Sequence, residues 1–210
     1  MRPLLDWLPW LLLVPSVASA QLPKDWQPWG PDSAQYQIGA DTTIAFSGHR
    51  SLRLASGPGA SADTWVAAIQ VVSPAPFRGH RVHLLAAGRT HAAGPASIWL
   101  RVEGRLNGAP ALLAFDNMAP NRAITGTTEW AAYEVVLDIS PDATAIAFGP
   151  LLQGTGIFWV DQFALEEVPD SVASTDQLEG PQLSPNPAAA EQDRTTRPVV
   201  LRPSNLDFEQ

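Results

Sequence analysis

Residues 98–104 read Ile-Trp-Leu-Arg-Val-Glu-Gly, so that apolar side chains alternate with Trp99, Arg101 and Glu103. An alternation with a period of two indicates a β-strand that has one face against a core and the other face toward solvent. Gly104 ends the pattern, as glycine does at strand boundaries. We therefore predict a strand whose outer face carries an aromatic ring beside two charges.

The same alternation recurs across residues 34–168, where Gly, Pro, Asn and Asp separate short apolar segments. These further segments are 44–46, 52–54, 65–72, 82–84, 113–115, 133–137, 146–148 and 158–166. No window of ten or more residues combines a 3.6-residue period with helix caps. We predict an all-β fold, a two-sheet antiparallel jelly-roll sandwich with about nine or ten strands.

Composition excludes several classes of protein. The chain has 210 residues, no cysteine, and 13 Lys and Arg against 21 Asp and Glu, which gives a net charge of −8. Without cysteine there are no disulfides, zinc–thiolate sites or thiol nucleophiles. An acidic chain lacks the positive footprint of a nucleic-acid binder, so we expect no nucleic-acid partner.

Residues 1–20 have the pattern of a secretory signal peptide. Arg2 precedes an apolar run over residues 7–14, and Ala18-Ser19-Ala20 matches an A-x-A cleavage site. The alternative is an uncleaved membrane anchor, but the run is shorter than the ~20 residues that span a bilayer. We expect a secreted or periplasmic protein that begins near Gln21 and has no membrane span after cleavage.

Four zones follow the predicted signal peptide. Residues 21–33 form a Trp- and Pro-rich lead-in, and residues 34–168 form the jelly-roll domain. Residues 169–203 are rich in proline and polar residues, so we predict a disordered linker that cannot bury enough apolar area to become ordered. Residues 204–210 regain alternating apolar residues and are predicted as a strand-like segment.

Three motifs carry a family resemblance. Residues 47–52 read Ser-Gly-His-Arg-Ser-Leu, residues 130–137 hold a WxxYxxxL pattern, and residues 156–165 run from Gly through Val-Asp to Leu. In this order they resemble the carbohydrate-binding-module jelly rolls that have the galactose-binding-domain-like fold. The tract over residues 98–130 is similar to accessory modules of exported bacterial proteins, some of which precede tail-processing-type serine peptidase domains or are attached to regulators. The resemblance implies an ancillary module and not a catalyst.

Modules of this kind commonly begin with a strand like NLDFE, which the lead-in lacks. Residues 205–209 read Asn-Leu-Asp-Phe-Glu instead. Two explanations remain open. The C-terminal segment folds back to supply the missing strand, or it marks the start of a truncated second module.

The predicted ligand-binding residues follow from the outward face of the strand at 98–104. Trp99 offers a flat ring to the C–H groups of a sugar. Polar side chains around it are expected to bind hydroxyl groups. The full set is Trp99, Arg101, Glu103, Asp116, Asn117 and Arg122. Trp65, Trp130 and Trp159 are further aromatic candidates, and the alternative for all of these residues is core packing or a salt-bridged surface.

The resemblance also implies a structural calcium site. Asp161 matches the first Asp of the family's VDD pattern, and Glu209 matches the Glu of DFE. Asp41, in a Gly-Ala-Asp-Thr turn, is a third candidate ligand, since calcium takes six to eight oxygens. The alternative is that Asp161 caps a turn without metal. No other cofactor is expected.

No catalytic motif stands out, and we predict an exported, non-catalytic module that binds glycan or another envelope polymer. One alternative is a structural or protein-interaction module that completes its sheet by strand addition, as a monomer or a strand-exchanged dimer. Another is a small glycoside hydrolase that uses Glu103 and Asp116 as paired carboxylates.

Overall fold

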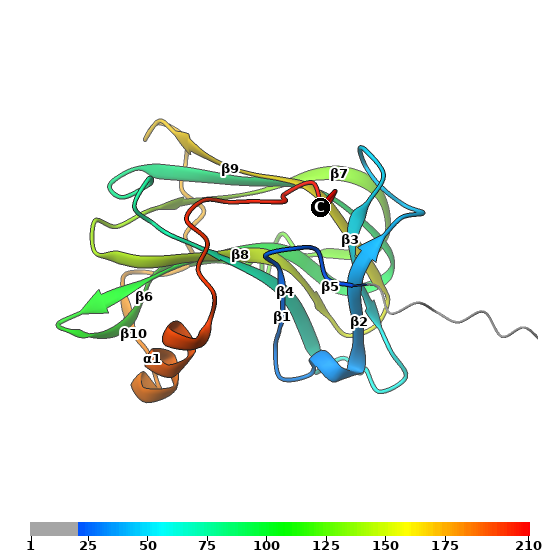
Figure 1. Ribbon diagram of the computed structural model, residues 1–210, viewed down its shortest axis with the longest axis horizontal. Helices are drawn as coiled ribbons and strands as arrows, with labels where there is room; N and C mark the ends of the chain where they lie inside the picture. The colour runs from blue at the N-terminus through cyan, green and yellow to red at the C-terminus, as the bar shows by residue number, and fades with distance from the viewer. Residues whose placement is uncertain (1–20) are drawn as a thin grey trace, which may run out of the picture.

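Strand β5, Arg81–Leu106, runs through both layers of the computed structural model, which describes residues 21–210 (Figure 1). The first half of β5 pairs with β7 (Ile124–Asp138) and β9 (Ile157–Val168). Its second half pairs with β6 (Ala109–Asp116) and β8 (Ala143–Gln153). Register shifts in the middle of β5 mark the passage between layers, because β-bulges bend a strand.

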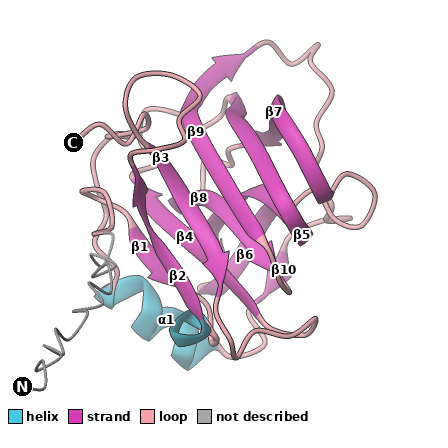
Figure 2. Ribbon diagram, turned by 90° about the vertical axis from the view of Figure 1, so that its right-hand side faces the viewer, coloured by secondary structure: helices cyan, strands magenta, loops and turns pink. Residues whose placement is uncertain are grey.

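The remaining strands extend the two layers outward from β5 (Figure 2). The first layer continues from β9 to β3 (Ser51–Ser56) and β2 (Tyr36–Asp41). The second continues from β8 to β4 (Trp65–Val72) and β1 (Gln27–Trp29). All pairs between these strands are antiparallel. The predicted all-β, two-layer antiparallel jelly-roll sandwich is confirmed.

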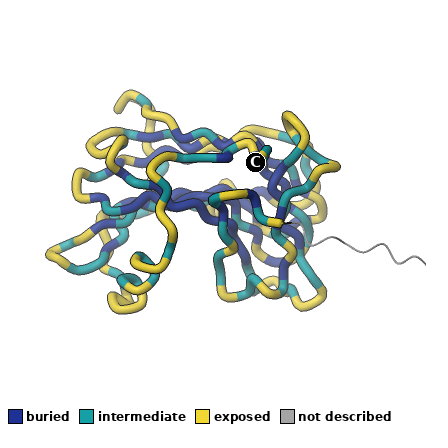
Figure 3. The backbone as a smooth tube through the Cα atoms, in the orientation of Figure 1, coloured by how far each residue is buried: buried dark blue, intermediate teal, exposed yellow. Residues whose placement is uncertain are grey.

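The core lies between the layers, and Figure 3 shows buried residues along the strands on both sides of it. Ile98, Leu100 and Val102 are fully buried there, as the alternation at residues 98–104 predicts. Burial of such side chains is the main favourable term in the stability of a β-sandwich. The predicted signal peptide, residues 1–20, lies outside the described residues. Among residues 21–210, no helix is both long and apolar enough to cross a membrane.

The prediction of a disordered linker over residues 169–203 is wrong. This segment contains β10 (Gln182–Leu183), which pairs with β6, and the helix α1 (Pro187–Thr196). Backbone N–H groups of Thr175 and Gln177 donate to the carbonyl oxygens of Val136 and Phe115. The composition argument counted only apolar area, whereas this segment is held by hydrogen bonds to the edges of a sheet that already exists.

Further along the tail, Val200 forms a parallel bridge with Val72 at the end of β4. The N–H of Val200 donates to the carbonyl of Val71 over 2.9 Å, and the N–H of Ser73 donates to the carbonyl of Val200 over 2.9 Å. The tail therefore lies against the second layer before it reaches the C-terminal segment.

Residues 204–210 fold back onto the lead-in, but they do not form the strand that we predicted. Trp26 Nε1–H donates to the carbonyl of Asn205 over 3.1 Å, and the N–H of Phe163 donates to the carbonyl of Leu206 over 2.9 Å. Asn205 and Phe208 have φ angles of 48° and 59°, which lie in the left-handed region and are incompatible with an extended strand. The segment therefore contributes isolated hydrogen bonds and individual side chains rather than the continuous backbone hydrogen bonds of a strand.

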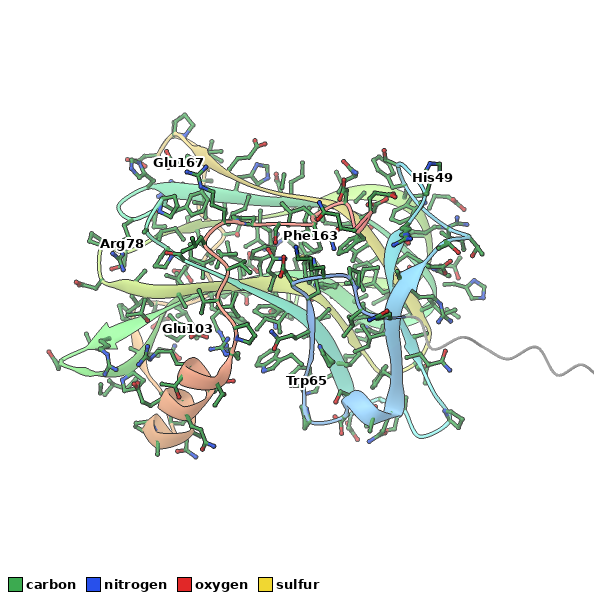
Figure 4. The ribbon with its side chains drawn as sticks, viewed as in Figure 1. His49, Trp65, Arg78, Glu103, Phe163 and Glu167 are labelled. Carbon is green, nitrogen blue, oxygen red and sulfur yellow. The ribbon has the colours of Figure 1, made fainter. Side chains whose placement is uncertain are left out.

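Phe208 is the most important of these side chains, and its exposed fraction is 0%. Its ring centroid lies 5.2 Å from that of Trp26 and 6.2 Å from that of Phe163. Phe148 completes the group at 5.8 Å from Trp26. Figure 4 shows Phe163 between the layers, beside the C-terminal segment. The two ends of the described chain thus meet in one aromatic cluster.

We expect Phe208→Ala to lower the free energy of unfolding by about 3–5 kcal/mol, the usual cost of removing a buried phenylalanine ring. Leu201→Ala is the matched control in the same tail, because Leu201 is 81% exposed, and it is expected to cost less than about 0.5 kcal/mol. Urea unfolding of both variants measures the difference. Equal losses of unfolding free energy in the two variants would contradict the closure of the core by the C-terminal segment.

Candidate functional site

The outer face of the layer built from β1, β4, β8, β5 and β6 is apolar, although we expected it to be solvated. A second buried cluster covers it, separate from the main core. Its members are Ala67, Ile69, Val71, Trp99, Ala145 and Ala147, with Trp29, Trp65 and Leu151 partly exposed at its border. Small side chains from β4 and β8 leave room for the large indole rings.

Three tryptophans stack on this face. The ring centroid of Trp29 lies 5.3 Å from that of Trp65 and 5.3 Å from that of Trp99. Trp99 is only 1% exposed, so the prediction that it forms an exposed platform is wrong. Strand β1 is the reason, because it pairs with β4 and brings Trp29 over the same face. The accessible parts of the stack belong to Trp29 and Trp65.

Arg101 lies at the edge of this stack. Its guanidinium carbon is 5.0 Å from the ring centroid of Trp29 and 5.9 Å from that of Trp99, within the range of cation–π attraction. Burial lowers the pKa of Arg101 from its ordinary value, and the ion pair with Glu103 opposes that effect. The guanidinium is therefore a poorly hydrated charge beside aromatic rings.

Glu103 joins this group to the tail. Arg197, which follows α1, donates from Nη2 to both carboxylate oxygens of Glu103 over 2.9 and 2.8 Å. The two side chains are 8% and 15% exposed, respectively. Figure 4 places Glu103 and Trp65 on the same side of the second layer. The predicted residues Arg101 and Glu103 thus lie together, with Trp29 and Arg197 as partners that the sequence argument missed.

The other three predicted ligand-binding residues lie apart from this group. Asp116 is fully buried, forms an ion pair with Arg122, and accepts a hydrogen bond from the N–H of Met118 over 2.7 Å. Asn117 Oδ1 accepts from the N–H of Ala119 over 3.1 Å. These contacts hold the loop after β6 in place, so the predicted six-residue binding set is divided in two.

This division also contradicts the paired-carboxylate version of a glycoside hydrolase. Asp116 lies opposite the core residue Leu100 in the β5–β6 register, whereas Glu103 lies on the outer face against Arg197. Each carboxylate has its own arginine partner. The two groups do not flank a shared space where a glycosidic bond would sit.

Two of the three predicted calcium ligands cap the same loop, between β2 and β3. Asp161 Oδ2 accepts from the N–H groups of Phe46 and Ser47 over 3.0 and 3.1 Å. Glu209 Oε1 accepts from the N–H groups of His49 and Arg50 over 2.6 and 3.0 Å. The C-terminal segment therefore fixes this loop through a carboxylate.

Gly48 allows the close approach of Glu209. Its φ angle is +66°, a conformation that glycine adopts without strain. A Cβ at this position would collide with the Glu209 carboxylate. The glycine of the sequence motif at residues 47–52 thus has a local structural role.

Asp41 does not join the other two carboxylates. Its oxygens accept hydrogen bonds from the N–H of Thr43 over 2.8 Å and from Trp159 Nε1–H over 2.8 Å. Within residues 21–210, no group of three or more His, Cys, Asp or Glu side chains comes together to hold a metal. Asp41 therefore does not come together with Asp161 and Glu209, whose oxygens accept from loop N–H groups, and the calcium site stays a prediction.

The two loop-capping carboxylates differ in their electrostatics. Burial raises the pKa of Asp161, although the N–H groups of Ser47, Gln162 and Phe46 oppose it. The N–H of His49 is the main cause that lowers the pKa of Glu209. Glu209 is thus held in its charged form, which attaches the end of the tail to the loop.

Comparison with known proteins identifies a relative by sequence similarity. No family model matches the chain. The chain is 35% identical over 153 residues to the uncharacterized HTH-type transcriptional regulator YbfP of Bacillus subtilis strain 168. The match covers 72% of this chain and 50% of that protein, so the chain spans about half the length of the relative.

Several solved carbohydrate-binding modules are similar in structure. The CBM22-1 xylan-binding domain of Paenibacillus barcinonensis Xyn10C is 16% identical, with a TM-score of 0.49 over 71% of this chain and 90% of that one. The C-terminal family 22 module of Clostridium thermocellum Xyn10B is 17% identical, with a TM-score of 0.48 over 72% and 89%. A family 16 carbohydrate-binding module is 16% identical, with a TM-score of 0.49 over 66% and 90%.

We expect Glu209→Gln to make stability less dependent on pH. A carboxylate with a lowered pKa stabilises the folded state above the ordinary Glu pKa of about 4.3, and this contribution is lost as the pH falls through its folded-state pKa. Urea unfolding at pH 6.5 and pH 3 should therefore show that the variant is less stable at pH 6.5 and that the gap narrows at pH 3.

Glu129→Gln controls for loss of a surface carboxylate, since the Glu129 side chain is 84% exposed. A stability gap for Glu209→Gln that stays constant between the two pH values would show that its charge does not hold the loop.

Proposed function

We propose that this domain is a non-catalytic glycan-binding module whose contact surface is the outer face of the second layer. The observation that carries the proposal is the tryptophan stack, in which Trp29 and Trp65 stay partly exposed beside Arg101. Indole rings offer flat, rigid apolar surfaces to the C–H groups of a sugar ring, and little conformational entropy is lost on contact. Charged side chains next to them supply hydrogen bonds to hydroxyl groups.

The non-catalytic role is proposed from the arrangement of the carboxylates. Glu103 and Asp116, the candidates for acid–base chemistry, are each bound by an arginine and lie in different surroundings. The motif resemblance to accessory modules supports the same role.

We further propose that the protein is exported and that its ligand is a glycan or another polymer of the cell envelope. The support is the signal-peptide pattern of residues 1–20, with its A-x-A site at Ala18–Ala20. A protein in that location meets polysaccharides at high local concentration.

The similarity to a transcriptional regulator favours a second candidate, a ligand-sensing module within a longer protein. The one α-helix of residues 21–210 is α1, so the described residues share with that regulator a part other than a helix-turn-helix. N-terminal sequencing of the protein from separated cell fractions distinguishes the two. If the protein is exported, its mature N-terminus lies near Gln21. A protein that retains Met1 and is found in the cytoplasm would favour the sensing module.

We expect Trp65→Ala to weaken glycan binding by about 1–3 kcal/mol, as for an aromatic residue at the centre of a binding surface. Calorimetric titration with xylan, β-glucan and peptidoglycan fragments provides the measurement. Trp130→Ala is the matched control, because Trp130 packs on Phe46, away from this stack, and its loss should leave affinity unchanged. Equal effects of the two substitutions, or no binding by the unchanged protein up to millimolar sugar, would overturn the proposed function.

A further inference from the structure

A small cavity lies beside Arg101 and Glu103, between β6, β10 and α1. Its volume is about 220 Å³, several times the ~30 Å³ that a water molecule occupies in the liquid. The charged residues that line it are Arg101, Glu103, Asp193, Arg194 and Arg197. Figure 1 shows α1 and the β6 hairpin near each other at the same end of the molecule.

The two carboxylates that line this cavity are already paired with arginines. Both Glu103 oxygens accept from Arg197, and Glu103 also pairs with Arg101. An oxygen of Asp193 lies 3.0 Å from Arg197 Nε. The carboxylates of the lining are therefore already engaged by the arginines within the protein.

Several N–H donors remain without an acceptor. Within residues 21–210, Arg101 Nε and Arg197 Nη1 are buried and have no hydrogen-bond partner, and both residues line the cavity. Trp99 Nε1 is also buried without a partner, but Trp99 does not line the cavity. Trp99 is 1% exposed, and the Arg197 side chain is 8% exposed. Buried donors without partners are costly, and a bound acceptor reduces that cost when the side chains adjust to it.

The charge balance points in the same direction. The chain as a whole carries −8, yet three arginines and two carboxylates line this cavity, and Glu191, which pairs with Arg194, lies outside the lining. Burial lowers the pKa of Arg101, and the positive charge of Arg197 adds to that effect. A negative group in the cavity would restore the stability of the charged guanidinium, whereas a cation would be repelled.

We propose that this cavity binds a carboxylate carried by a sugar, so that the module recognises an acidic glycan containing uronic acid residues. Planar carboxylates match the fork of N–H donors on arginine. Arg101 touches both the tryptophan stack and the cavity, so a glycan lying on Trp29 and Trp65 brings its acidic substituent to the arginines. This inference rests on the proposed function and adds the ligand's charge to it.

The test compares matched acidic and neutral probes on the full chain. The probes are oligogalacturonate and oligoglucuronate, together with their carboxyl-reduced neutral counterparts. Calorimetry should give about tenfold tighter binding of an acidic probe than of its neutral partner in 50 mM salt. The preference should shrink in 500 mM salt, because salt screens charge attraction.

Arg194→Gln tests the cavity directly, with Arg105→Gln as the matched control. Both arginines pair with Glu191, but Arg194 lines the cavity and Arg105 lies outside it. We expect the acidic preference to fall from about tenfold to about twofold in Arg194→Gln and to persist in Arg105→Gln. Circular dichroism checks that each variant is folded.

The outcomes separate this inference from the proposed function. Equal binding of acidic and neutral probes would overturn the acidic specificity and leave glycan binding in place. An acidic preference that is the same in Arg194→Gln would place the anion elsewhere and also overturn it. No binding of any probe by the folded protein would reject both.

Discussion

The contact of Trp26 with Phe208 is the interaction on which the rest of the structure depends. It joins the start and the end of the described chain inside the core, 5.2 Å apart between ring centroids. The lead-in that carries Trp26 continues directly into β1, which brings Trp29 onto the outer face of the second layer. The tail that carries Phe208 runs through Arg197 on its way there, and Arg197 reaches Glu103. Closure of the core and assembly of the candidate site are therefore consequences of the same two flanking segments.

This arrangement explains why a face that is usually solvated is buried here. A sheet in a sandwich normally packs one face and leaves the other to water. In this domain the lead-in places Trp29 over this face, and the tail places Arg197 against Glu103. Trp29 and Trp65 nevertheless stay partly exposed. The remaining surface combines rigid rings with charges that are poorly hydrated.

Local patterns in the sequence predicted the parts that depend on neighbouring residues. The alternation at residues 98–104 correctly placed Ile98, Leu100 and Val102 in the core, because side-chain direction in a strand has a fixed period of two. The same alternation placed Trp99 on the opposite face, and that is also where it lies. Its burial was not predictable from the alternation, since it depends on β1, which pairs with β4 some forty residues along the chain. The prediction that residues 169–203 are disordered failed for the same reason, because this segment is held by hydrogen bonds to strands that are distant in the sequence. The ion pair between Arg197 and Glu103 was not predictable either. Arg197 lies in a segment with the composition of a linker, and no local pattern indicates which distant residue it contacts.

Hydrogen exchange of the backbone amides that join the tail to the strands tests most directly whether the tail is part of the folded domain. The N–H groups of Gln177 and Val200 donate to Phe115 and Val71, and that of Phe163 donates to Leu206. We predict that these three amides exchange nearly as slowly as those in the central strand β8, because they open only when the core opens. Exchange of Gln177 and Val200 at the rate of an unfolded peptide, with β8 still protected, would contradict the account.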